Sequence, residues 1–268
     1  MIYDVNGTVI YDPNGNFSDN MELDYAFDSA TNANYTVLRI YQTKRDGTKQ
    51  YPFARIPNPT IASPISALDL ARAEGWAVTI NAGLAWPATG VYVDGIAIQN
   101  GVLIHDSPTE YHVGALPLTI NSSGTLGYTE ANPDGATLIA NGIKSALLGF
   151  CPIIVNYATV SPPSVQHVSH FTQNAQRQII GQFGNGDYCI VTCEGRDYDH
   201  SDGWTIAEAQ TICQKVGLKF AYNCDGGGST ETCLGKKQIN TIYENETGRH
   251  VPSFIVFNGT DAYSIPTP

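Results

Sequence analysis

Six Asn-Gly dipeptides divide this chain of 268 residues into short segments. Asn and Gly tolerate the positive φ angles of a two-residue turn, so this pair between apolar alternations is the strongest local signal for a β-hairpin. Three of the dipeptides, which begin at Asn100, Asn141 and Asn185, have apolar segments on both sides. They predict three hairpins, and therefore a chain rich in β-structure.

Two segments carry helix signals at both ends. The first is predicted to begin after Ser63 as its N-cap, with a proline at the first helical position, and to end at Gly75. The second opens with a capping box of Thr205 and Glu208 and ends at Gly217. Its apolar side chains are spaced to face a core.

Together these elements predict the α+β class: one β-rich domain with mixed or antiparallel sheets, several Asn-Gly hairpins and at least two helices. The chain is 42% hydrophobic, which is enough to bury a substantial core. Residues 1–59 are predicted to form an N-terminal β segment packed on a main domain of residues 60–268.

The chain is acidic, with a formal net charge of −11. Such a surface repels polyanions, so we expect neither duplex nucleic acid nor an anionic membrane as a partner. The sequence shows no export signal and no apolar run of about 20 residues. We therefore expect a soluble protein, cytoplasmic by default or associated with a phage particle.

Six cysteines are spread over the second half of the chain, and only Cys189 and Cys193 are close in sequence. No C-x-x-C pair is present, so the spacing does not favour a zinc cluster. We expect free thiols, most of them small buried side chains. No metal and no organic cofactor are predicted.

The segment 218–230 carries the clearest functional signal. An apolar run, expected to be a strand, ends at Asn223 and Cys224 and is followed by Asp225, three glycines, Ser229 and Thr230. Consecutive glycines allow a ligand to approach the backbone, whose N–H groups can then form an anion-binding concavity. The alternative is a flexible Gly/Ser turn in which Asp225 caps its own backbone.

A weak internal repeat links this segment to an earlier one. Each predicted helix ends at a glycine, and an asparagine follows six residues later, from Gly75 to Asn81 and from Gly217 to Asn223. Each asparagine is followed by a glycine within three residues. Two such units would bring two strand ends to one pocket, although coincidence explains the pattern as well.

The order of five motifs resembles that of the phosphodiester glycosidase family, over roughly residues 60–258. The motifs are the segments Asn81-Ala82-Gly83, Arg177 to Gly181, Glu194 to Thr205, Asn223 to Thr230, and Arg249 to Val256. The resemblance implies hydrolysis of the bond between a sugar anomeric carbon and a phosphodiester, without a cofactor. The expected partner is thus a small-molecule or glycan sugar phosphate.

The resemblance also implies roles for particular residues. Asp225 is the expected key carboxylate, and Arg177 is the expected clamp on the phosphate, because a guanidinium binds two phosphate oxygens with matched geometry. Asn81 and Glu194 are the other two expected catalytic residues. The expected substrate- and phosphate-binding residues are Gly83, Asn223, Gly226, Gly227, Gly228, Ser229, Thr230, Arg196, Arg249 and His170.

Each of these assignments has a structural alternative. The arginines could form ion pairs or bond loop carbonyls, the asparagines could serve strand-end turns, and His170 could be a solvated loop residue. Glu231 competes with Glu194 as a second carboxylate. For the whole chain, the alternatives are a non-catalytic glycan- or nucleotide-binding protein and a structural component of a phage or cell-surface assembly.

Overall fold

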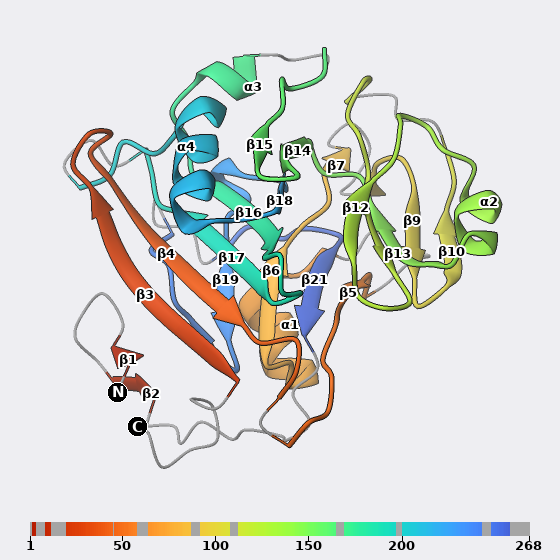
Figure 1. Ribbon diagram of the computed structural model, residues 1–268, viewed down its shortest axis with the longest axis horizontal. Coiled ribbons are helices and arrows are strands. Elements are labelled where there is room, and N and C mark those ends of the chain that lie inside the picture. The colour runs from red at the N-terminus through yellow and green to blue at the C-terminus, as the bar shows by residue number, and fades with distance from the viewer. Residues whose placement is uncertain are drawn as a thin grey trace.

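The computed structural model describes most of the chain. The described residues are 2–3, 9–11, 20–44, 46–57, 64–86, 92–107, 112–164, 169–196, 200–242 and 248–257. Within them, all strand pairings between named elements are antiparallel, and two large sheets lie face to face between helices (Figure 1). The predicted α+β class, with a β-rich single domain, is confirmed.

The larger sheet has seven strands, in the order β15-β14-β18-β16-β17-β4-β3. Their bounds are β3 (Met21–Asp28), β4 (Ala33–Ile40), β14 (Cys151–Val155), β15 (Ala158–Thr159), β16 (Arg177–Gln182), β17 (Tyr188–Cys193) and β18 (Phe220–Asn223). Helices α3 (Ser169–Thr172) and α4 (Ile206–Val216) lie on its outer face (Figure 1).

The facing sheet has five strands, in the order β20-β19-β6-β21-β5. These are β5 (Pro52–Arg55), β6 (Val78–Asn81), β19 (Thr232–Leu234), β20 (Lys237–Gln238) and β21 (Phe254–Phe257), with α1 (Ala67–Glu74) packed on the outer face. The described part of segment 1–59 supplies strands to both sheets, because β4 pairs with β17 and β5 pairs with β21.

A third sheet lies at one side of this sandwich, in the order β10-β9-β13-β11-β12 (Figure 1). It comprises β9 (Ala97–Gln99), β10 (Val102–His105), β11 (Leu118–Asn121), β12 (Leu126–Tyr128) and β13 (Ile143–Leu147), with α2 (Gly135–Ala140) packed against it. Two short ribbons complete the described strands: β1 (Ile2–Tyr3) with β2 (Val9–Tyr11), and β7 (Ala85–Trp86) with β8 (Tyr92–Val93).

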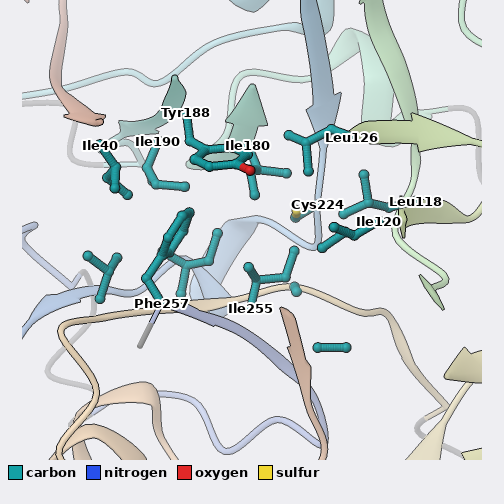
Figure 2. Packing of buried hydrophobic residues seen from close by; sticks show 14 of the residues in the cluster. Ile40, Leu118, Ile120, Leu126, Ile180, Tyr188, Ile190, Cys224, Ile255 and Phe257 are labelled. Atoms are coloured by element: carbon teal, nitrogen blue, oxygen red, sulfur yellow. The ribbon is translucent and has the colours of Figure 1, made fainter. Parts of the chain in front are cut away.

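The central core fills the space between the sheets (Figure 2). Side chains alternate across β16, so Ile180 enters this core while Ile179 packs into the cluster beneath α4. Tyr188 and Phe257, from opposite sheets, meet edge to face with ring centroids 5.4 Å apart. The strands are therefore buried on both faces, which explains their nearly continuous apolar sequences.

Two of the three predicted hairpins are confirmed. β9 pairs with β10 across Asn100 and Gly101, both at positive φ, and β16 pairs with β17 across the turn at Asn185. The prediction at Asn141 is wrong, because the segment before it is helix α2 rather than a strand. Asp134 caps that helix by accepting the Thr137 N–H at 2.6 Å, a local signal that outweighs the β-propensity of the segment.

The two predicted helices exist, but the first begins later than expected. Its N-cap is Ser66, whose Oγ accepts the Asp69 N–H, whereas Ser63 lies outside the described residues. Ile65 is instead extended, since it forms a β-bridge with Val251. The second helix, α4, has the predicted capping box and ends at Gly217 in the left-handed conformation.

All six cysteines are buried and none is in a disulfide, so the prediction of buried free thiols is confirmed. Burial raises the pKa of the Cys213 thiol to about 12, which makes it unreactive at neutral pH. Within the described residues, no helix is both long and apolar enough to cross a lipid bilayer.

Candidate active site

The register of the seven-stranded sheet brings the predicted site residues together. β16 runs antiparallel to β18 with Ile179 opposite Asn223, so the start of β16 and the end of β18 share one edge. Arg177 and Asp225 therefore meet there, and both line a cavity of about 500 Å³. Its ionisable lining residues are His112, Arg177, Arg196, Asp225, Arg249 and His250.

Asp225 is held at the wall of this cavity by its own turn. Its Oδ1 accepts the Gly226 N–H at 3.0 Å, and the Ser229 hydroxyl donates to the same carboxylate. Burial raises the pKa of Asp225, while Ser229 and the nearby charge of Arg249 oppose that rise. A carboxylate with a raised pKa is suited to accept a proton.

Arg177 is almost fully buried, at 3% exposure, where β16 begins. Its Nε donates to the Trp204 carbonyl and its Nη2 to the Gln173 carbonyl, each at 2.7 Å. Burial lowers the pKa of Arg177 to about 10, so the guanidinium is still charged at neutral pH. These bonds hold the guanidinium in place at the cavity that Asp225 also lines.

The glycine turn after Asp225 forms a short 3₁₀ helix, Gly227–Ser229. Four of its N–H groups already have protein acceptors: Gly226 donates to Asp225, Gly227 to the Gln176 carbonyl, and Ser229 and Thr230 to carbonyls of the turn itself. These four N–H groups are therefore engaged within the protein. The exposed guanidiniums of Arg196 and Arg249 lie along this turn, at Gly227 and Gly228.

The packing around this turn predicts different stability losses for alanine at two of its glycines. A Cβ at Gly226 would lie 2.7 Å from the Gln176 carbonyl oxygen, which is fixed backbone. We expect Gly226→Ala to lower the free energy of unfolding by about 1–3 kcal/mol. A Cβ at Gly228 would meet only the Arg249 guanidinium, at 2.5 Å, which can swing away. Gly228→Ala should thus be nearly neutral in urea unfolding, and equal losses would contradict this assignment.

Several predicted site residues lie behind the cavity instead of lining it. Asn81 is buried, with its Nδ2 donating to the Asp225 carbonyl at 2.7 Å and its Oδ1 accepting the Glu231 N–H at 3.0 Å. Asn223 is also buried, and its Nδ2 bonds the Cys224 carbonyl. The two strand ends of the sequence repeat do meet, and Asn81 positions the Asp225 turn from the second sheet.

The remaining small residues are close-packing positions. Gly83 lies against Ser253, where a Cβ would come within 2.3 Å of the Ser253 hydroxyl oxygen. Thr230 is buried at 3% exposure, at the end of the glycine turn. Both support the wall of the site, and neither is among the residues that line the cavity.

Neither of the two candidate second carboxylates lines the cavity. Glu194 accepts the Thr241 N–H at 2.6 Å, and Glu231 accepts the Ala67 and Leu68 N–H groups at 2.7 and 3.1 Å. Among the described residues, Asp225 is thus the only carboxylate that lines the cavity. His170 belongs to α3, and its side chain lies outside the described part.

Sequence reasoning missed a histidine in this cavity. His112 is buried at 6% exposure, and its Nδ1 lies 2.8 Å from Oδ2 of Asp94, which is also buried. Its ring packs edge to face on Phe150, with centroids 6.0 Å apart. His112 is also close enough to Asp225 to interact with its charge. No local pattern marks either residue, since they follow different short strands and come together only in the fold.

The cavity is a cationic site in an acidic protein. Three arginines and two histidines line it beside the single Asp225 carboxylate. This charge balance favours an anionic ligand, because guanidiniums bind phosphate and carboxylate oxygens in pairs. In the described part of the chain, no group of three His, Cys, Asp or Glu side chains is arranged to hold a metal ion.

Comparison with known proteins identifies the family. The model of the phosphodiester glycosidases matches residues 74–258, well over half of the chain. The chain belongs to the phosphodiester glycosidase family. The matched region contains all the cavity residues discussed above, and the resemblance inferred from the five motifs is confirmed.

The fold of this phosphodiester glycosidase family member also resembles solved structures. It matches the catalytic domain of zebrafish N-acetylglucosamine-1-phosphodiester alpha-N-acetylglucosaminidase, auto-inhibited by its pro-peptide, with a TM-score of 0.71 at 15% identity, over 90% of this chain and 82% of that one. It matches a hypothetical protein from Synechocystis with a TM-score of 0.65 at 14% identity, over 89% of this chain and 62% of that one.

A curated relative is the SPbeta prophage-derived uncharacterized protein YomE of Bacillus subtilis strain 168. It is 29% identical over an alignment of 203 residues that covers 73% of this chain. The match spans only 31% of the relative's length.

Proposed function

We propose that this protein hydrolyses the glycosidic bond of a sugar phosphodiester. The observation that carries the proposal is the pairing of a single carboxylate, Asp225, with a wall of cations in one cavity. Cleavage of the anomeric C–O bond leaves negative charge on phosphate and positive charge on the sugar carbon. Guanidiniums stabilise the first and a carboxylate stabilises the second. Membership of the phosphodiester glycosidase family supports the same reaction.

The cavity residues divide between the two ends of the substrate. We assign Asp225 to the anomeric carbon, as base, nucleophile or stabiliser of an oxocarbenium-like state. We assign the phosphate to Arg177, which is rigid and buried, and to Arg249, which lies beside the glycine turn. Asn81 and Ser229 act through Asp225, by fixing its backbone and its carboxylate.

The test is hydrolysis in ¹⁸O-labelled water, with a panel of sugar phosphodiesters and nucleotide sugars. Attack at the anomeric carbon places the label in the released sugar, whereas attack at phosphorus places it in the phosphate, where phosphorus NMR detects the isotope shift. We expect the label in the sugar and an unlabelled phosphate monoester. Label in the phosphate would instead identify a phosphodiesterase, and bound substrate without turnover would identify a binding protein.

A further inference from the structure

We propose that His112, oriented by Asp94, is the acid that protonates the departing phosphate in this site. The inference rests on the proposed function and adds a proton donor, a role that neither predicted second carboxylate fills. Glu194 and Glu231 bind backbone N–H groups elsewhere, so the usual carboxyl pair of glycosidases is not formed among the described residues. His112 is a buried histidine that lines the same cavity as Asp225.

The contact with Asp94 determines which nitrogen of His112 exchanges protons. Asp94 is 2% exposed and lies 2.8 Å from Nδ1, so an ionised Asp94 keeps the proton on that nitrogen. Proton exchange is then restricted to Nε2. The ring packs against Phe150, itself packed on Phe171, which limits the positions that the imidazole can take. This is the arrangement in which a carboxylate orients a histidine for acid–base chemistry.

The proton balance of the reaction is complete with these two groups. The anomeric C–O bond breaks with its electron pair on the phosphate oxygen, and the Nε2 proton of His112 moves to that oxygen. A water oxygen forms the new bond to the anomeric carbon and gives one proton to Asp225. Transfer of that proton to solvent, and uptake of another at His112, restore the site. The products are the free sugar and a phosphate monoester.

The role proposed for His112 predicts a pH dependence of activity. The ionisable groups that line the cavity with His112 are Asp225, Arg177, Arg196, Arg249 and His250, and Asp94 lies 2.8 Å from its Nδ1. An acid must be protonated to act, so an activity that needs a proton donor should fall at high pH. Asp94→Asn replaces the carboxylate 2.8 Å from Nδ1 with a neutral amide, and the high-pH limb of the kcat profile should therefore move to lower pH.

The decisive measurement compares two diesters of the same sugar, one with methyl phosphate and one with trifluoroethyl phosphate as leaving group. The fluorinated phosphate is less basic and needs less help from an acid. We expect His112→Gln to lower kcat by about 100-fold for the methyl ester and severalfold less for the fluorinated one, with loss of the high-pH limb. His200→Gln, an exposed histidine outside the cavity, should leave kcat unchanged.

Equal losses on the two esters, or a retained high-pH limb, would overturn the role of His112 while leaving the proposed function intact. An inactive wild type on the whole panel would instead reject the proposed function. Circular dichroism checks that His112→Gln is folded. If it is not, the shift of the high-pH limb in Asp94→Asn tests the role of His112 instead. Asparagine keeps the shape of the aspartate side chain and removes its charge.

Discussion

Asp225→Asn is expected to lower kcat by about 10³-fold and, at the same time, to raise the free energy of unfolding at neutral pH. The loss of activity follows from removing the only carboxylate among the described residues that line the cavity. The gain in stability follows from its environment, since burial raises the pKa of Asp225 and makes the ionised form costly in the folded state. Asn keeps an oxygen that can accept the Gly226 N–H.

The pH dependence of this gain can be stated in advance. A carboxyl whose folded pKa is raised binds its proton more tightly in the folded protein than in the unfolded chain. Its protonated form therefore contributes stability below the unfolded pKa, about 4, and that contribution is lost as the pH rises through the folded value. The stability difference between Asp225→Asn and wild type should thus be largest at neutral pH and vanish below about pH 4.

Asp187→Asn provides the matched control. Burial of Asp187 opposes ionisation, but hydrogen bonds from Arg39, Gln42 and Asn185 outweigh it and lower the pKa of Asp187. The ion pair to Arg39 measures 2.7 Å. This control should lose stability at neutral pH and keep full activity. Kinetics and urea unfolding across pH measure both variants, and a loss of stability in Asp225→Asn at neutral pH would contradict the assignment.

Glu231→Ala is expected to lower the free energy of unfolding by about 2–4 kcal/mol, because it leaves one buried and one partly buried N–H group of α1 without this acceptor. Glu231 is 1% exposed and caps α1 from the opposite end of the sequence, through Ala67 and Leu68. Its own N–H donates to Asn81, which in turn holds the Asp225 carbonyl. The variant should therefore also loosen the turn that carries Asp225.

The comparison for this prediction is Glu208→Ala. Glu208 caps α4 within its own first turn. Its Oε2 accepts the Thr205 N–H at 2.7 Å, in a partly buried position. Loss of such a cap costs about 1 kcal/mol. Urea unfolding of the two variants should separate them clearly, and a loss in Glu231→Ala no larger than that in Glu208→Ala would show that water replaces the missing acceptor.

The parts of the fold that could be predicted are those with short-range signals. The turns at Asn100 and Asn185 and the cap at Thr205 depend on φ preferences and hydrogen bonds within a few residues, so they were found. The strand predicted before Asn141 is wrong for a related reason. The apolar residues of this segment are typical of a strand, but the N-cap at Asp134 favours a helix.

The residues that line the cavity could be predicted only where a motif marks them. Asp225 and Arg177 stand at strand ends that the sequence displays, and antiparallel pairing of β16 with β18 puts those ends together. His112 and Asp94 have no such mark. Their pairing depends on two short segments of the third-sheet region meeting at the cavity, which a pattern within either segment does not encode.

By itself, the sequence determined the strand-rich class, the second helix, the family motifs and the presence of a carboxylate in a glycine-rich strand end. These follow from residues that are neighbours in the chain. Only the tertiary structure decided that Asn81 and Glu231 support the site from behind and that His112 enters it. The physical reason is that a side chain's role depends on its buried partners, and those partners lie up to 164 residues away.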